Sequence, residues 1–111
     1  MESEKALLGF AALAQSTRLD VVRALVSCEP DGLRAGNLAE RLSVPANTLS
    51  SHLNILSQAG LVRAERAGRA VTYRICLDQL RGLVLFLLQD CCGGRTDLCE
   101  PLLADLAACR A

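Results

Sequence analysis

Apolar side chains recur at helical spacing along most of the chain and alternate with polar ones in one short stretch. The helical spacing predicts two helices within residues 1–27, a short helix over 34–42, a longer one over 46–59 and another from residue 77. Alternation within 61–75, with a turn centred on Gly68, predicts a β-hairpin. We therefore expect a mainly α fold with a small β-hairpin.

The same pattern predicts the inward faces and the boundaries of the first two helices. The expected apolar positions are Leu7, Phe10, Ala11 and Ala14 on the first, and Leu19, Val22, Leu25 and Val26 on the second. Ser16 or Thr17 is expected to cap the second helix, because a hydroxyl can accept from the free N–H groups of a first turn. The turn over residues 29–32 contains a proline and a glycine and ends that helix.

The helix over 46–59 has two contrasting faces. Leu49, Leu53 and Leu56 share one stripe, which predicts a core face. The opposite side collects short, uncharged polar side chains: Asn47, Ser50, Ser51, Asn54 and Gln58. Such side chains suit a helix that lies in a DNA major groove and reaches base edges and phosphates. The alternative is an ordinary solvated face, which is more often rich in Glu and Lys.

Charge is balanced overall but not locally. The chain has 12 lysines and arginines against 12 aspartates and glutamates, which argues against coating nucleic acid by charge alone. Residues 61–75 nevertheless hold four arginines and one glutamate, a local net charge of +3. Arg66 and Arg69 flank the hairpin turn, where they could contact the DNA backbone or minor groove. Charged hairpin edges also serve to block aggregation, which is the competing interpretation.

The helix that begins at residue 77 is too apolar for a small monomer. Leu80, Leu83, Val84 and Leu87 lie on one side, and further apolar residues widen the stripe beyond one face. We interpret this helix as a dimer interface shared with the first helix. A central core helix is the alternative, and a dimer satisfies both.

Length and the N-terminal segment limit the organisation of the protein. The 111 residues predict a single domain over 1–111 whose C-terminal segment carries the cysteines and the dimerisation helix. The longest apolar run is too short to span a bilayer, and the start lacks the features of a secretory signal. We therefore expect a cytoplasmic protein without a membrane partner. In a reducing compartment, six cysteines favour soft-metal binding or thiol chemistry over disulfides.

Two sequence segments resemble the ArsR/SmtB family of metal-responsive repressors. They are Leu38-Ala39-Glu40-Arg41-Leu42, and the stretch from Pro45 to Val62 with its Ser-x-His-Leu-x-x-Leu-x-x-x-Gly-Leu-Val string. The similarity covers roughly residues 5–90. It implies a homodimeric winged helix-turn-helix fold that binds double-stranded operator DNA and is released by an effector. It places Asn47, Thr48, Ser50, Ser51 and Asn54 on the recognition helix, and Arg66, Arg69 and Arg74 on the wing.

His52 matches the histidine that the family carries in this helix. It flanks the apolar stripe, so we expect a structural role, bonded to a backbone group or bridging to a phosphate. A base contact or a metal ligand is the alternative. Because His52 is the single histidine of the chain, a zinc site built from histidines is excluded.

The cysteines after the last helix are the candidate effector site. Cys91 and Cys92 are adjacent, and Cys99 follows a Gly-Gly pair that lets the chain fold back. Three thiolates suit trivalent arsenic or antimony, and the arrangement resembles arsenic-responsive members of the family with C-terminal cysteines. The family's arsenic site before the recognition helix is absent here, since residues 37–51 contain no cysteine.

Other uses of the thiols stay open. A disulfide among the C-terminal cysteines would make a redox sensor on the same DNA-binding module. A two-cysteine organoarsenical site, or Cd(II), Pb(II) or Cu(I), would use the same donors, and Cys109 could join them. Cys28 and Cys76, at the ends of elements, are expected to be small buried hydrophobes.

No catalytic arrangement is evident in the chain. The Cys-x-x-Cys spacing of thiol oxidoreductases does not occur, and the single histidine leaves no triad. We therefore predict a repressor and not an enzyme, without an organic cofactor. The predicted apo homodimer binds its operator and is released when As(III) or Sb(III) occupies the three-thiolate site.

Overall fold

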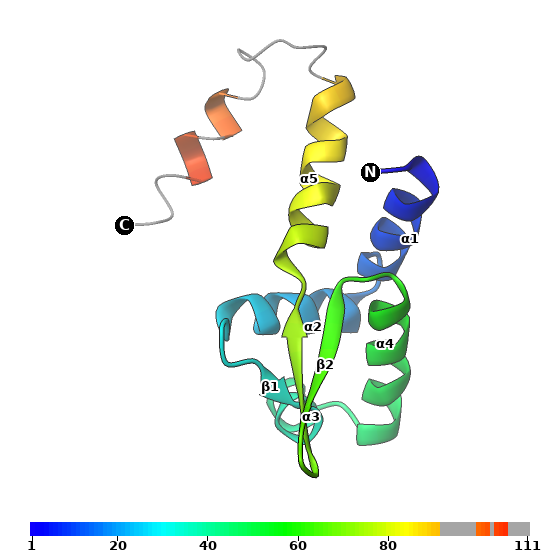
Figure 1. Cartoon of the computed structure of the whole chain (residues 1–111), viewed down its shortest axis with the longest axis vertical. Helices are drawn as coiled ribbons and strands as arrows, with labels where there is room; N and C mark the ends of the chain where they lie inside the picture. The colour runs from blue at the N-terminus through cyan, green and yellow to red at the C-terminus, as the bar shows by residue number, and fades with distance from the viewer. Residues whose placement is uncertain (92–99, 103, 107–111) are drawn as a thin grey trace.

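The computed structural model describes residues 1–91, 100–102 and 104–106, and confirms the mainly α fold with a small β-hairpin (Figure 1). Its helices are α1 (Ser3–Leu13), α2 (Ser16–Ser27), α3 (Ala35–Leu42), α4 (Ala46–Gln58) and α5 (Leu77–Cys91). Its strands are β1 (Leu33–Arg34), β2 (Val62–Ala67) and β3 (Ala70–Ile75). The sequence pattern did not predict β1, because two residues are too few to show a period.

The three strands form one antiparallel sheet in the order β1-β3-β2. Val62 lies opposite Ile75 and Ala67 opposite Ala70, so β2 and β3 form the predicted hairpin, hereafter the wing. The turn between them places Gly68 at a φ of 63°, in the left-handed region that glycine adopts without steric cost. The wing therefore turns where the sequence predicts.

One hydrophobic core joins the helices to the base of the wing. Leu49, Leu53 and Leu56 of α4 are all buried, which confirms the predicted core face of this helix. Leu25 of α2 and Ile75 of β3 are buried in the same cluster. This packing holds α4 by one face and leaves the opposite face at the surface.

The prediction for α1 was right for Phe10, which packs against the core, and wrong for Leu7, Ala11 and Ala14, because the fully buried residues of this helix are small. Ala6, Gly9 and Ala12 are buried, whereas Leu7 is 66% exposed and Ala11 is also exposed. The cause is the close approach of α5: a Cβ on Gly9 would lie 2.8 Å from Leu83 Cδ2. Only a small residue allows two helices to approach so closely.

Two smaller predictions about α2 also need correction. Leu19 and Val26, expected to face inward, are exposed. The N-cap is Gln15 and neither hydroxyl residue, since its side chain accepts from the Arg18 backbone N–H at 2.8 Å. A longer amide side chain therefore supplies the acceptor that Ser or Thr usually provides.

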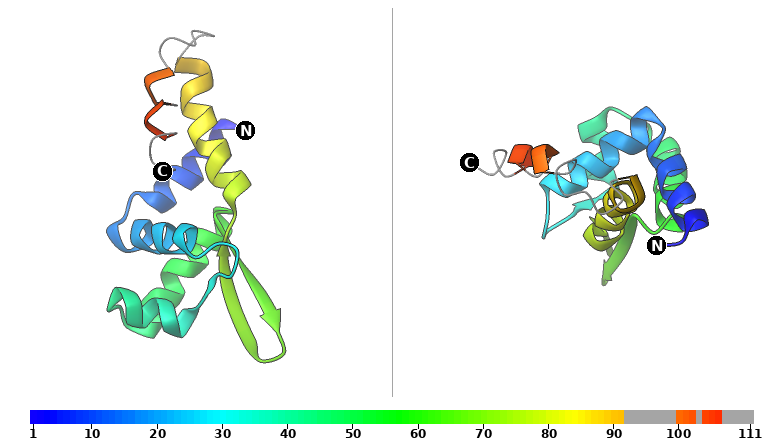
Figure 2. Two further views of the ribbon diagram at one scale, coloured as in Figure 1. Left: turned by 90° about the vertical axis from the view of Figure 1, so that its left-hand side faces the viewer. Right: turned by 90° about the horizontal axis from the view of Figure 1, so that it is seen from above.

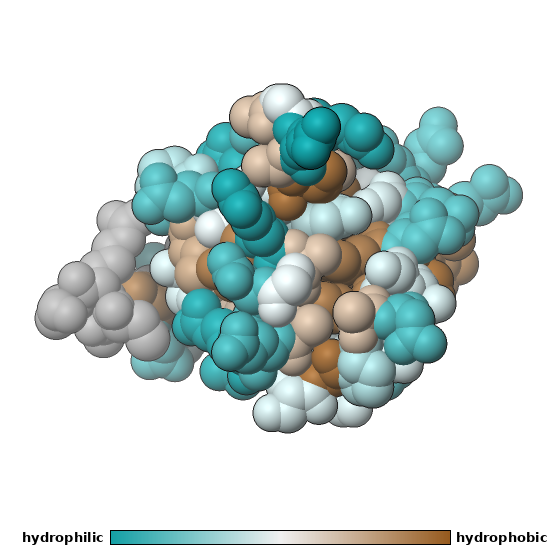
Figure 3. Space-filling view, turned by 90° about the horizontal axis from the view of Figure 1, so that it is seen from below, coloured by the Kyte–Doolittle hydropathy of each residue, from teal (hydrophilic) through white to brown (hydrophobic). Residues whose placement is uncertain are grey.

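Different elements form the two ends of the molecule. The long α5 rises beside α1 at one end, and the tip of the wing projects at the other (Figures 1 and 2). Seen from the wing end, hydrophilic side chains form most of the rim, with apolar ones between them (Figure 3). No helix in the described part of the chain is long and apolar enough to cross a membrane.

Candidate nucleic-acid interface and effector segment

The outer face of α4 is polar and accessible along its length. The burial of the three leucines on one side leaves the predicted recognition residues exposed, namely Asn47, Thr48, Ser50, Ser51 and Asn54. None of them carries a formal charge, so this face can approach a phosphate backbone without repulsion and offer both donors and acceptors. The structure therefore brings all five of the predicted helix residues to one surface.

His52 lies at the edge of that surface and is half-buried. Its Nδ1 is 3.3 Å from a terminal nitrogen of Arg18, which lies on α2. A bond of His52 to the protein was expected, but the recorded partner is a side chain and not a backbone group. No local sequence signal identifies Arg18, because it precedes His52 by 34 residues.

The tip of the wing carries exposed, unpaired positive charge. Arg66 and Arg69 are both exposed on either side of the Gly68 turn. Within the part of the chain that the structure describes, neither has a carboxylate within ion-pair distance. Their guanidinium groups are therefore available to phosphate oxygens, which Arg can bind through two donors at once.

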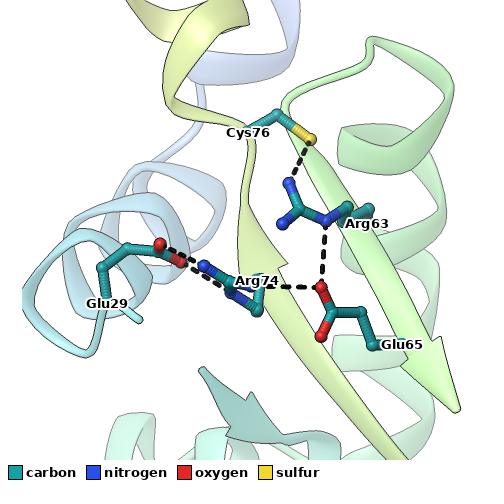
Figure 4. A network of polar contacts seen from close by, with 5 residues as sticks. All are labelled: Glu29, Arg63, Glu65, Arg74 and Cys76. Atoms are coloured by element: carbon teal, nitrogen blue, oxygen red, sulfur yellow. Dashed lines mark hydrogen bonds and ion pairs between the residues drawn. The ribbon is translucent and has the colours of Figure 1, made fainter. Parts of the chain in front are cut away.

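The base of the wing uses its arginines differently (Figure 4). Arg74 donates to both carboxylate oxygens of Glu29, at 3.1 Å and 2.6 Å, and to Glu65 at 3.2 Å. Arg63 donates to Glu65 at 3.2 Å, and its second nitrogen lies 4.0 Å from Cys76 Sγ. Arg74 thus ties the wing to the end of α2, and this geometry favours a structural role over the predicted DNA contact.

The electrostatics of this network follow from its hydrogen bonds. The Arg74 guanidinium holds the pKa of Glu29 below its usual value of 4.5, against the smaller opposing effect of desolvation. The same hydrogen bonds raise the pKa of Arg74. The pKa of Arg63 is also raised, first by its contact with Cys76 and then by Glu65. The pair of Arg74 and Glu29 therefore stays charged at neutral pH.

The candidate effector cysteines lie at the border of the described residues. Cys91 is the last residue of α5, whereas Cys92, Cys99 and Cys109 lie outside the described part of the chain. Among the described residues no three His, Cys, Asp or Glu side chains are grouped as for a metal. The three-thiolate site thus stays a prediction, attached to the end of α5.

The prediction for the other two cysteines was wrong. Cys28 and Cys76 are free and only half-buried. Each sulfur faces an arginine: Arg41 donates to Cys28 Sγ at 3.2 Å, and Arg63 lies beside Cys76. Neither thiol therefore serves as a small core residue.

The other end of the molecule exposes a large apolar surface on α1 and α5. Of the predicted interface residues, Leu80 is half-buried, Val84 is exposed and Leu87 is 51% exposed. Leu83 requires a correction, because it is only 1% exposed and packs against Gly9 in the core of its own chain. Leu7 and Leu8 of α1 extend the exposed surface. We call this exposed part of α1 and α5 the apolar face.

Comparison with known proteins agrees with this architecture. A family described as a helix-turn-helix domain matches residues 13–65. The HTH-type transcriptional regulator KmtR of Mycobacterium tuberculosis is 37% identical over 76 residues, which are 68% of this chain and 56% of KmtR. The chain thus spans about half of KmtR. The HTH-type transcriptional regulator CmtR of the same organism is 36% identical over 109 residues, 96% of this chain and 86% of CmtR.

Solved structures give the same result. An ArsR-like transcriptional regulator from Rhodococcus sp. RHA1 superposes with a TM-score of 0.68 at 28% identity, over 94% of this chain and 93% of that one. A homodimeric winged helix-turn-helix DNA-binding domain from Mycobacterium bovis, described as a possible ArsR-family regulator, gives 0.65 at 25% identity, over 81% and 82%.

The fold and these relatives define a winged helix-turn-helix transcriptional regulator. The chain belongs to the ArsR/SmtB family, as the sequence resemblance predicts. The relatives are described as transcriptional regulators, in agreement with the prediction of a regulator of transcription. By its position in the winged helix-turn-helix fold, α4 corresponds to the recognition helix of the family.

Proposed function

We propose that this regulator is a homodimeric repressor that binds operator DNA without its effector and is released by trivalent arsenic or antimony. The observation that carries the effector assignment is the position of three thiols in the sequence, with Cys91 ending α5 and Cys92 and Cys99 following it. Arsenous acid condenses with three thiols to form three As–S bonds and release three waters. Three thiolates without a histidine suit a soft ion such as As(III) or Sb(III) better than they suit a zinc ion of the kind that histidines bind.

The apolar face supports a second copy of the chain as the partner. Exposure of large apolar side chains such as Leu7, Leu8 and Leu87 to water is unfavourable, and a monomer of this size rarely exposes so many. A solved neighbour is described as a homodimeric winged helix-turn-helix domain. A two-fold dimer through this face would present two recognition helices and two wings to the half-sites of a pseudo-palindromic operator.

The same helix links the effector to the DNA. Because α5 carries part of the apolar face and ends at Cys91, drawing the three cysteines together would reorder the end of an interface helix. A change in how the subunits meet alters the spacing of the two α4 helices, which must match successive major grooves. Allosteric coupling of about 1–3 kcal/mol per site is typical, and two sites act in a dimer.

The DNA contacts proposed are the five exposed polar residues of α4 together with Arg66 and Arg69 at the wing tip. The helix residues supply base and phosphate contacts, and the arginines supply the charge that the helix lacks. A chain with no net charge that carries two exposed arginines at the wing tip favours specific binding over general coating of DNA.

A release assay tests the effector under full reduction. The chain selects its duplex from a random-sequence library, and binding is then followed while arsenite or peroxide is added. We expect arsenite to release the duplex and peroxide to leave it bound. Release by peroxide alone would instead support the redox alternative and contradict the metalloid site.

Cysteine variants test the residues. Cys91→Ser, Cys92→Ser and Cys99→Ser are each expected to bind the duplex as the wild type does and to lose release by arsenite. Cys28→Ser and Cys76→Ser are matched controls, because both thiols lie in the described part of the chain away from the end of α5. If a control variant loses release while the three site variants keep it, the site assignment is wrong.

A further inference from the structure

Arg18 joins three helices at a single point. It lies on α2, and its Nε donates to the Ala12 carbonyl in the last turn of α1 at 2.6 Å. A terminal nitrogen of the same guanidinium is 3.3 Å from His52 Nδ1 on α4. The recognition helix therefore has a polar link, through one side chain, to both of the first two helices.

The guanidinium is held in a fixed direction at this point. Its donors lie in a rigid planar fork, so the bond to Ala12 sets where the donor toward His52 points. The carbonyls of a last helical turn carry partial negative charge, which favours a cation there. Among the residues that the structure describes, no carboxylate lies within ion-pair distance of Arg18 to compete for it.

This contact defines the state of the His52 ring. Arginine can only donate, so Nδ1 must be the acceptor, and a neutral imidazole then carries its proton on Nε2. Within the described chain Nε2 has no recorded partner, and the half-buried ring adjoins the exposed Ser51.

Apolar packing alone does not lock α4 at this corner. A hollow of about 340 Å³ lies between α1 and α4, and Leu8, Arg18, Ile55 and Gln58 line part of it. Ile55 is also exposed. Apolar contact between α1 and α4 is therefore incomplete at this hollow, and the bonds of Arg18 add a polar link beside it.

We propose that Arg18 is a positioning residue for DNA binding. It holds the His52 ring with Nδ1 as acceptor, so that Nε2–H is presented as a donor to a phosphate oxygen of the operator beside α4. Arg18 acts through His52 and does not itself touch the DNA. The inference rests on the proposed function in one respect, that the face of α4 beside His52 lies against the duplex.

A double-mutant cycle on operator affinity tests this. The variants are Arg18→Met, His52→Ala and both together, each titrated with the duplex that the wild-type chain selects from a random library. We expect each single variant to bind on the order of tenfold more weakly, the effect of losing one charge-assisted hydrogen bond. The double variant is expected to bind no more weakly than His52→Ala. Additive losses, or no loss in Arg18→Met, would overturn the proposal.

The tautomer of His52 separates positioning from a general structural role. His52 is the only histidine, so the ring-nitrogen NMR signals of the chain report on its ring. In the wild type we expect the proton on Nε2, because Nδ1 accepts from Arg18, whereas in Arg18→Met both tautomers should be populated. If both chains give the same ring-nitrogen spectrum, Arg18 does not set the state of His52.

Two further measurements keep the result interpretable. Arg23→Met is the matched control, because Arg23 is exposed on the same helix and its replacement removes the same charge; this variant should keep the wild-type ring-nitrogen spectrum. If Arg18→Met does not fold, as judged by circular dichroism, the cycle is run with Arg18→Lys, whose single nitrogen cannot span both partners.

The outcomes for the effector and for Arg18 are distinguishable. A chain that binds its duplex but ignores arsenite contradicts the proposed effector and leaves the cycle measurable. Additive effects of Arg18 and His52 overturn the positioning role whatever arsenite does. A chain that selects no duplex overturns both proposals together.

Discussion

The tip and the base of the wing carry the same residue type in opposite electrostatic settings. At the tip, Arg66 and Arg69 are exposed and have no carboxylate partner among the described residues. At the base, Arg74 is bound by two glutamates, and the side chains of its pair with Glu29 are only 22% and 18% exposed. One region offers its charge to a partner, and the other uses it within the fold.

The strand register explains why the base needs these carboxylates. Arg63 lies directly opposite Arg74 in the β2–β3 pair, and like charges at paired positions are destabilising. Glu65 bridges the two guanidinium groups, and Glu29 binds Arg74 from the end of α2 (Figure 4). The difference teaches that the local charge of +3 is not spread over the wing. Its free part is concentrated at the tip.

Charge reversal at the tip is expected to have the largest effect. Arg66→Glu combined with Arg69→Glu should weaken operator binding on the order of a hundredfold at about 0.1 M salt. Each lost phosphate contact should also take about 0.9 from the slope of log affinity against log salt. Fluorescence anisotropy over a salt series measures both quantities. An unchanged slope would mean that the tip does not contact phosphates.

Removing Arg74 from the base of the wing should lower the stability of the fold and not the salt dependence of DNA binding. Arg74→Met leaves the half-buried Glu29 without its donors, so the Tm should fall by several degrees while the salt slope of DNA binding is kept. Arg63→Met is the matched control, because its pair with Glu65 is half-exposed and such pairs contribute little. Thermal unfolding followed by circular dichroism measures the difference. If Arg74→Met lowers the salt slope and leaves the Tm unchanged, the arginines at the tip and at the base of the wing have the same role in DNA binding.

Acidification should gradually remove the stability that the Arg74–Glu29 pair supplies at the base of the wing. This effect should be smaller than the two above. The pKa of Glu29 is lower in the folded chain than its usual 4.5, so its contribution to stability is fully present above that pH. It is lost as the pH falls through the lowered pKa, because the protonated carboxyl no longer pairs with Arg74. Urea unfolding at several pH values should show the wild type more stable than Glu29→Gln at neutral pH, with the difference shrinking in acid. A constant difference would contradict this assignment.

The recognition helix shows how far local pattern extends. Its apolar period predicts which face is buried, and the exposed polar set of α4 follows without knowledge of any other element. The hairpin is predictable for the same reason, since alternation and the Gly68 turn are local features. The candidate DNA-binding residues of α4 and the wing tip could therefore be identified from sequence.

The first helix shows where such reasoning ends. Large apolar residues usually mark a buried face, but at a close helix crossing the small ones are buried. Leu83 and Gly9, whose side chain and backbone approach closely, are far apart in the sequence. Their contact turns Gly9 toward α5 and leaves Leu7 and Leu8 at the surface. That reversal adds Leu7 and Leu8 to the apolar face on which the proposed dimer rests.

By itself, the sequence determined the order of the helices α1 to α5 and of the two wing strands, the two faces of α4, the position of the wing turn and the membership of the ArsR/SmtB family. These depend on periodicity and on short motifs, which act over a few residues. Only the tertiary structure decided which arginines are free, that Arg18 meets His52, and that Leu83 belongs to the core. Those contacts depend on distances between side chains from separate elements, which no local pattern specifies.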